Sequence, residues 1–272
     1  ALEPDFYVDM LTSDGAGKID PDYFYHSGSY PKTAKVQFDY HSWNYCREPG
    51  DTTIGRQRGL LGFWDTNKGG ASGVRAAGTS EMVFWHGSTS AKNSSVTGTS
   101  NGRARIEFDY LNTTASWSSS STTKPIADVL RLPSNVVTVP YHLCHLENCS
   151  YYSYLGIYAF RVFEQMSEGA EPVVVREYRP ACVNGRPALY DPYTMTAAHP
   201  TTDGFTIPMT NVITVATGKT LHVSRHSATQ RSVTLETGSE LVFDGLATLN
   251  PTEGVTLPAG GVVTVSLSVS TG

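Results

Sequence analysis

The stretch Ala34-Lys35-Val36-Gln37-Phe38-Asp39-Tyr40 alternates apolar and polar residues. Successive side chains of a strand point to opposite faces, so this alternation predicts a strand with one buried face and one polar face. Similar segments bounded by turn residues occur at 6–10, 60–64, 81–86, 103–110, 136–139, 156–164 and 173–178. Strands in this number, with no helical pattern between them, predict an all-β sandwich of two sheets.

The overall composition supports an all-β chain and narrows its partners. Charged residues make up 17% of the 272 residues, and 15 tyrosines raise the aromatic share to 11%, a mixture that favours strands and turns. The net charge of −5, with scattered lysines and arginines, argues against a nucleic-acid partner. No apolar run approaches the roughly 18 residues of a membrane-spanning helix. Because the chain starts at Ala1 with polar sequence, we expect a secreted protein whose signal peptide has been removed.

Two polar tracts interrupt the predicted strands. Residues 88–102 and 112–124 are rich in Ser, Thr and Asn. They are typical of long loops, or of hairpins at the edge of a sheet with solvent-facing side chains.

The C-terminal part of the sequence repeats itself. Residues 214–223 (TVATGKTLHV) align with 234–243 (TLETGSELVF), and a degenerate third copy, TLPAGGVVTV, occupies 256–265. Strand, glycine corner and strand at this spacing predict β-solenoid coils, with a meander of hairpins as the alternative. We therefore predict two domains, a β-sandwich over 1–200 and a β-repeat domain over 201–272. Three coils barely enclose a core, so we expect the sandwich or another molecule to cover the repeat.

The chain contains four cysteines, an even number that is typical of two disulfides in a secreted protein. We expect Cys144 to pair with Cys149 and Cys46 to pair with Cys182. A zinc site at Cys144, His145 and Cys149 is the alternative, although Cys-x4-Cys without a second pair is a poor zinc signature.

Two motifs carry a resemblance to a known family. Residues 156–164 (GIYAFRVFE) and 176–191 (REYRPACVNGRPALYD) resemble the closing strands of concanavalin A-like, laminin-G-like domains of large secreted bacterial proteins. Residues 6–9 (FYVD) are similar to the opening of such domains, and the likeness extends over roughly 5–198. The C-terminal repeats resemble passenger repeats of autotransporter-like adhesins. The resemblance implies a two-sheet jelly roll at a cell surface or in the extracellular space, and binding rather than chemistry.

Glycan-binding sites combine aromatic rings that stack on sugar faces with polar side chains that bond hydroxyl groups. The four tryptophans are candidates for such rings. We predict Trp117 as the best exposed ring because serines surround it, and expect Trp64 and Trp85 to be core residues more often than ligand plates. The predicted ligand-binding set is Trp117, Trp64, Trp85, Tyr110, His86 and Asn67.

Enzymatic motifs are weak in this sequence. Glu107 and Asp109 share one strand face, as in jelly-roll glycosidases, but the second catalytic glutamate of that motif is missing. Tyr141, His142, His145 and Tyr151 offer groups that a polysaccharide lyase uses, without its motif geometry. Asp14, Asp20 and Asp22 offer oxygen ligands for calcium in a glycine-rich loop, and a plain surface turn is the alternative. We expect no cofactor and no catalytic activity.

Two functions remain from the sequence. The first is a carbohydrate-binding or adhesive module. The alternative is a structural subunit of an extracellular filament or surface layer that assembles through strand edges. A lyase or glycosidase ranks third.

Overall fold

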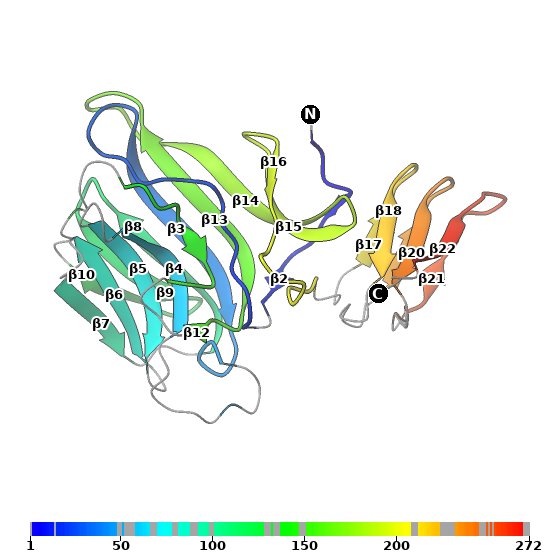
Figure 1. Cartoon of the computed structure of the whole chain (residues 1–272), viewed down its shortest axis with the longest axis horizontal. Helices are drawn as coiled ribbons and strands as arrows, with labels where there is room; N and C mark the ends of the chain where they lie inside the picture. Colours follow the sequence, from blue (N-terminus) through cyan, green and yellow to red (C-terminus); the bar gives the residue numbers. More distant parts are fainter. Residues whose placement is uncertain are drawn as a thin grey trace.

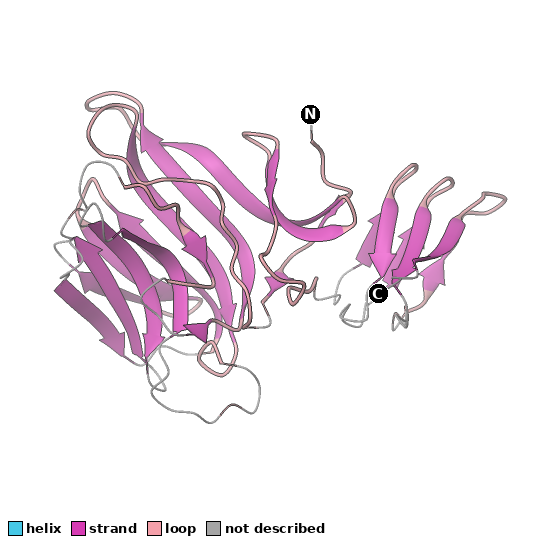
Figure 2. Ribbon diagram, in the orientation of Figure 1, coloured by secondary structure: helices cyan, strands magenta, loops and turns pink. Residues whose placement is uncertain are grey.

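The structure is a computed structural model of the chain, and it is built of strands (Figure 2). It describes residues 2–13, 15–47, 51, 58–65, 70–77, 81–87, 92–97, 101–127, 132, 137–146, 151–207, 212–223, 232–244, 249, 251 and 253–268. Within these ranges no helix occurs, so the all-β prediction is confirmed. None of the described segments forms a helix long and apolar enough to cross a membrane.

One layer of the sandwich is a ten-stranded sheet. Its order is β10 (Thr123–Ala127), β9 (Thr114–Ser119), β8 (Gly102–Asp109), β3 (Lys32–Ser42), β13 (Leu155–Gln165), β14 (Val173–Val183), β15 (Arg186–Asp191) and β16 (Thr196–Ala198). Short strands β1 (Phe6–Tyr7) and β2 (Leu11–Thr12) pair with β14 and β13. All of these pairs are antiparallel, as expected of a jelly-roll layer.

The second layer is a six-stranded sheet. It follows the order β11 (His142–Leu143), β4 (Arg58–Asp65), β5 (Gly70–Ala77), β6 (Glu81–Gly87) and β7 (Lys92–Thr97), and β12 (Tyr151–Tyr152) pairs in parallel with β4. Figure 1 shows this sheet lying against the longer strands β3 and β13.

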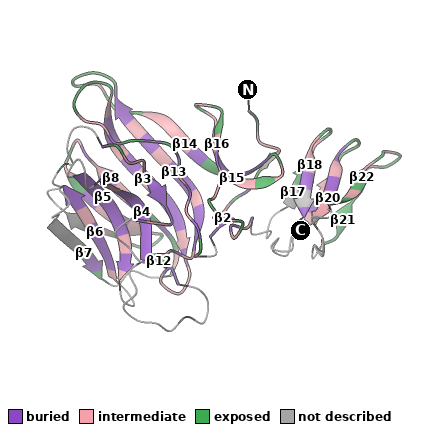
Figure 3. Ribbon diagram, viewed as in Figure 1, coloured by how far each residue is buried: buried purple, intermediate pink, exposed green. Residues whose placement is uncertain are grey.

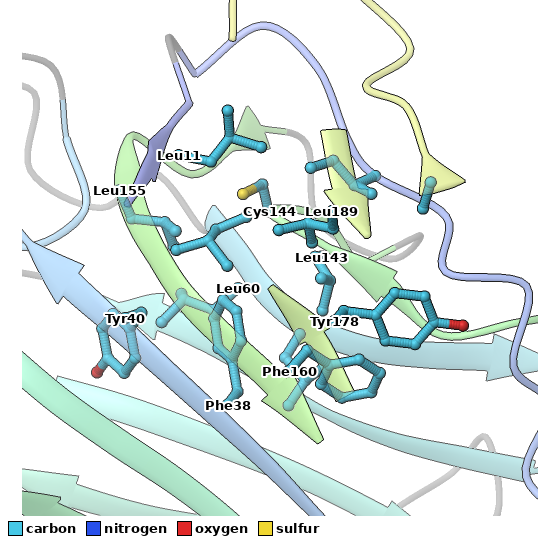
Figure 4. Packing of buried hydrophobic residues seen from close by; sticks show 14 of the residues in the cluster. Leu11, Phe38, Tyr40, Leu60, Leu143, Cys144, Leu155, Phe160, Tyr178 and Leu189 are labelled. Atoms are coloured by element: carbon cyan, nitrogen blue, oxygen red, sulfur yellow. The ribbon is translucent and has the colours of Figure 1, made fainter. Parts of the chain in front are cut away.

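Aromatic side chains fill the space between the two sheets. Phe108 of the large sheet meets Phe84 of the small sheet with ring centroids 5.8 Å apart. Tyr110 joins both layers by hydrogen bonds, since its hydroxyl lies 2.6 Å from Ser72 Oγ and 2.6 Å from Tyr141 Oη. Figure 4 shows the neighbouring part of the core around Phe38 and Phe160. Paired hydroxyl groups let these tyrosines be buried without the cost of an unsatisfied polar group.

Several strands differ from the sequence prediction. The polar tracts follow the edge-hairpin alternative in their described parts, because β7 ends the small sheet and β9 and β10 end the large one. The prediction of a strand over 136–139 was wrong for its described part, 137–139, which forms a bend tied to β4 by Asp65 and Thr138. Strand β5 was missed, because its Gly-Ala-Ser composition carries little strand propensity of its own.

The C-terminal repeat forms stacked parallel strands (Figure 1). One sheet contains β17 (Val212–Val215), β19 (Ser232–Leu235) and β21 (Val255–Thr256), and the other contains β18 (Thr220–Val223), β20 (Glu240–Asp244) and β22 (Thr264–Ser268). Hairpins would pair antiparallel, so the β-solenoid prediction is confirmed and the meander was wrong.

The register of the repeat agrees with the sequence alignment over the first two coils. Thr214 pairs with Thr234 and Val223 with Phe243. In the third coil Thr234 pairs with Thr256 as aligned, but Phe243 pairs with Leu267 rather than with Val265. The turn between the strands of this coil is therefore two residues longer than its counterparts.

The predicted domain division at residue 200 stays a prediction. The segment after it still bonds back to the sandwich: Thr206 and Thr12 form a two-way bridge, and Thr201 N donates to Lys18 O at 2.9 Å. Phe205 and Ile207 are buried in the main core cluster.

The expected disulfide between Cys46 and Cys182 is not formed. Cys46 is a buried thiol that donates to Ser42 Oγ at 3.6 Å, and Cys182 is a buried thiol that donates to Asp5 Oδ2 at 3.7 Å. The Cys46–Cys182 pairing was wrong because each sulfur has its own oxygen partner. Cys149 lies outside the described residues, so the Cys144–Cys149 pairing stays a prediction.

Burial raises the pKa of Cys46 to about 12, so its reactive thiolate is scarce at neutral pH. We expect iodoacetamide at pH 8 to modify Cys46 and Cys182 in denaturant without reductant, and to leave both unmodified in the native protein. Peptide mass spectrometry measures both states. Protection that persists in denaturant until a reductant is added would instead reveal a disulfide.

Candidate functional site

Three of the predicted ligand-binding residues lie inside the sandwich. Trp117 is 1% exposed and donates Nε1–H to Tyr40 Oη at 3.1 Å. Tyr110 and His86 are buried as well. The prediction for Trp117 was wrong because β9 alternates, so that Ala115 and Trp117 face the core while the serines between them face outward.

Trp64 and Trp85 lie on the outer face of the small sheet, half-buried, since the neighbouring Phe63 and Phe84 occupy its inner face. Their ring centroids are 4.6 Å apart at 64°, and the Arg75 guanidinium lies 4.6 Å from the Trp85 ring. We call Trp64 and Trp85 the tryptophan pair. The Trp64 ring and the Arg75 guanidinium both lie close to the Trp85 ring. Their positions limit the use of that ring as a flat platform for a sugar. Asn67 lies outside the described residues.

The residues considered for a lyase do not converge on one site. Tyr141 is in the core, whereas Tyr151 is 39% exposed. His142 Nδ1 contacts Asp20, and His145 stacks on Tyr152 with centroids 4.5 Å apart. Burial lowers the pKa of His145 to about 4. No group of three or more metal-ligating His, Cys, Asp or Glu occurs among the described residues.

The calcium prediction involves a loop in which Asp20 already has partners. Its carboxylate contacts Lys18 at 3.4 Å and the imidazole of His142. Burial alone would raise the pKa of Asp20, but the hydrogen bond with His142 and the nearby Lys18 ammonium group hold it below its usual value. Asp14 lies outside the described residues, and the expectation that the chain needs no cofactor stays a prediction.

A second set of aromatic side chains gathers on the outer face of the large sheet. It consists of His41, Trp43, Tyr154, Tyr158 and Arg103, and we call it the aromatic cluster. His41 and Trp43 rings lie 4.5 Å apart, and Trp43 and Tyr154 lie 5.7 Å apart. The four rings are half-buried and Arg103 is exposed. The cluster therefore offers ring surface and polar atoms to solvent at one place.

Strand alternation directs two members of the aromatic cluster outward. In β3 the residues from Ala34 to Ser42 at even positions are buried, which leaves His41 on the outer face. In β8 the buried Ala104 leaves Arg103 on the same face, and the register places Arg103 directly opposite His41.

A bulge in β13 brings Tyr158 into the cluster. The pairing with β3 shifts between Ile157 and Ala159, so Tyr158 has no partner residue in the ladder. Its hydroxyl lies 3.2 Å from His41 Nδ1, and the Arg103 guanidinium lies 4.2 Å from its ring centroid. Burial lowers the pKa of His41, so the imidazole is neutral at pH 7 and has one donor and one acceptor nitrogen.

Gly156 makes room for Trp43. A Cβ at this glycine would lie 3.1 Å from Trp43 Cη2 and 2.2 Å from Met10 Sδ. The missing side chain thus lets the indole and the methionine approach the backbone of β13, which fixes the position of the Trp43 ring.

Ion pairs cover the same sheet face beside the aromatic cluster. Asp39 accepts from Arg105 at 2.5 Å and from Arg161 at 2.9 Å, and Arg161 also donates to Glu177 at 2.8 Å. Burial alone would raise the pKa of Asp39, but the two arginine hydrogen bonds hold it below its usual value. These pairs join strands β8, β3, β13 and β14 across the sheet.

Glu107 and Asp109 lie on this outer face, as their alternation predicted. Lys35 Nζ lies 3.5 Å from Glu107 and 3.7 Å from Asp109, and Gln37 donates to Glu107 at 2.6 Å. Both carboxylates therefore have cationic or amide partners, an arrangement that matches a surface acidic pair better than an acid and a nucleophile.

The sequence contained part of the signal for the aromatic cluster. Trp43 is one of the four tryptophans, and His41 continues the alternation that begins at Ala34. The contribution of Tyr158 depends on a bulge, and that of Arg103 on strand register; neither has a local pattern in the sequence.

Comparisons with known proteins carry no argument about the fold or the function of this chain. No protein-family model and no curated protein matches the chain. Among solved structures, mouse laminin alpha1 chain domains LG4-5 are similar with a TM-score of 0.39 and 12% identity, over 66% of this chain and 49% of that one. The chain thus spans about half the length of that laminin fragment. The fold assignment rests on the strand pairing itself.

The burial of Trp117 leads to a stability prediction. Trp117→Ala should lower the free energy of unfolding by about 3–5 kcal/mol, because it leaves a cavity and removes the bond to Tyr40. Urea unfolding followed by circular dichroism measures this change. Trp64→Ala, at a half-buried surface ring, should cost clearly less, and equal losses would contradict the assigned positions.

Asp39 provides a pH-dependent prediction. Since its pKa is lowered in the folded state, its contribution is present above the unfolded value of about 3.9 and is lost as pH falls through the folded value. Asp39→Asn should cost about 2 kcal/mol at pH 7, and the difference from wild type should shrink below pH 4. Glu107→Gln, at a partly exposed ion pair on the same face, should cost less than about 1 kcal/mol. A pH-independent Asp39→Asn difference would refute this account.

Proposed function

We propose that the chain is a non-catalytic binding module that recognises carbohydrate at the aromatic cluster of His41, Trp43, Tyr154, Tyr158 and Arg103. The observation that carries the proposal is the convergence of four half-buried rings and an exposed guanidinium from three strand regions on one sheet face. Sugar rings present C–H faces that stack on aromatic rings, and hydroxyl groups that bond imidazole, phenol and guanidinium.

The rigid surroundings of the cluster support a binding role. His41, Tyr158 and Arg103 sit on strands of the large sheet, and Gly156 fixes Trp43. Preorganised side chains lose little conformational entropy when a ligand arrives, which favours affinity for small polar ligands. The carboxylates on the same face already form ion pairs with arginine or lysine side chains. This arrangement suits a binding surface better than acid–base chemistry.

We propose a cell-surface or extracellular location for this module. The support is the sequence resemblance to secreted laminin-G-like domains. The cysteines lend no support, because Cys46 and Cys182 are thiols where an extracellular chain was expected to carry a disulfide.

A glycan array probed with the full chain tests the proposed function. We expect binding to at least one glycan class, and we expect Trp43→Ala to weaken it by about tenfold or more, as for a central aromatic contact. Arg103→Gln should weaken binding with no loss of stability, since its side chain is exposed. Tyr193→Ala, at a tyrosine 55% exposed on the loop after β15, is the matched control and should bind as wild type.

Two outcomes would overturn the proposal. Absence of binding across the array removes the carbohydrate function. Binding that survives Trp43→Ala and disappears in Trp64→Ala would place the site at the tryptophan pair on the opposite sheet.

A further inference from the structure

The aromatic cluster offers more hydrogen-bond donors than acceptors. Arg103 supplies five N–H groups and Trp43 supplies an indole N–H, and neither side chain can accept a hydrogen bond. The phenol groups of Tyr154 and Tyr158 and the neutral imidazole of His41 can act in both ways. None of the five residues of the cluster is a carboxylate or an amide. A ligand that satisfies these groups is therefore rich in acceptors.

The donors of Arg103 are available to a ligand. Its side chain is exposed, and its guanidinium lies 4.2 Å from the centroid of the Tyr158 ring. Among the described residues, no hydrogen-bond acceptor and no carboxylate contacts this guanidinium. The contact with the ring restricts the position of a long side chain and leaves its planar fork of N–H groups open.

The charge on the outer face of β8 changes sign along the strand. Arg103 and Arg105 lie at the end next to the aromatic cluster, and Glu107 and Asp109 lie at the other end. All four share the outer face because buried residues alternate with them, and Figure 3 shows buried and less buried residues in the strands of this sheet. An anionic ligand is thus attracted to the end of β8 that carries the cluster.

Further across the sheet, arginine side chains lie above the carboxylates that they bind. Asp39 and Glu177 expose 5% and 12% of their side chains, whereas their partners Arg105 and Arg179 expose 43% and 51%. Guanidinium groups therefore form the outer layer of these ion pairs. This part of the sheet presents positive charge to solvent, although the whole chain carries a net charge of −5.

We propose that the saccharide bound at the aromatic cluster is acidic, and that Arg103 binds the carboxylate of a uronic acid unit. This inference rests on the proposed function and adds the charge of the ligand. An ionised carboxylate is an acceptor only, and its two oxygens match two parallel N–H groups of a guanidinium. In a uronic acid the carboxylate is attached directly to the sugar ring, so stacking of the ring also fixes the carboxylate. A sulfate ester is attached through an additional oxygen and rotates more freely.

The spacing of the cluster suits this arrangement. The rings of Tyr158, His41 and Trp43 follow one another from the Arg103 guanidinium, with centroids 6.3 Å and 4.5 Å apart. A sugar that stacks on these rings has the guanidinium beside it. Arg105 lies two residues further along the same face, where it can attract the carboxylate of a neighbouring unit.

A glycan array that pairs each uronic acid oligosaccharide with its carboxyl-reduced form tests the inference. Reduction replaces the carboxylate by a neutral hydroxymethyl group and leaves the size of the sugar nearly unchanged. We expect the full chain to bind at least one acidic oligosaccharide about tenfold more tightly than its reduced form, because a charge-assisted hydrogen bond is lost. Arg103→Gln should remove this preference, whereas Trp43→Ala should weaken the binding of both forms.

The matched control removes the same charge elsewhere. Arg186→Gln changes a side chain that is 61% exposed after the β14–β15 turn, and it should keep the preference for the acidic form. Equal binding of the acidic and reduced forms would overturn the inference and leave the proposed function intact. Binding confined to sulfated glycans on the same array, or a preference that persists in Arg103→Gln, would also overturn it. Absence of binding to every glycan would remove both proposals.

Discussion

The pairing of β3 with β13 is the contact on which the rest of the sandwich depends. Both strands are 11 residues long and pair along almost their full length at the centre of the large sheet. Their inner faces supply Phe38 and Phe160 to the core. Alternation along β3, and along β13 apart from its bulges, directs the intervening side chains to the outer face. The core and the candidate site thus lie on opposite faces of the same two strands, and the register between these strands positions both. A slip by one residue would move Asp39 and His41 inward and the aromatic layer outward.

The sequence predicted those features that follow from a single strand. Alternation at residues 34–40 and 103–110 identified two central strands and the shared face of Glu107 and Asp109, and the 20-residue repeat identified the parallel coils. Features that arise between strands were not predictable in this way. Trp117 looked exposed among serines because its burial depends on pairing with β8, and Tyr158 reaches the aromatic cluster through a bulge. The thiols at Cys46 and Cys182 show that an even number of cysteines does not by itself predict disulfides, because a disulfide also needs two cysteines at the right separation and orientation.

The two parts of the chain keep their apolar surface from water in different ways. In the sandwich, edge strands β7 and β10 come together, and Lys124 Nζ of β10 donates to Thr97 O of β7 at 2.7 Å, which ties the two layers at their rim. In the solenoid each coil covers the one before it, so the protection of a ladder residue depends on having a neighbour on either side. The ion pairs of Asp39 and the tyrosine hydroxyl contacts add directional bonds to the sandwich. In the solenoid, Glu240 accepts hydrogen bonds from Thr220 and Ser266 of the neighbouring coils.

Nearest-neighbour stacking gives the solenoid a graded lifetime along its axis. In such a linear array, opening a terminal unit breaks one inter-coil contact, whereas opening an internal unit breaks two. The coil that contains β19 and β20 has a described neighbour on each side, so its amide protons exchange with solvent only when two inter-coil contacts break, and they should exchange more slowly than those of a coil with one neighbour.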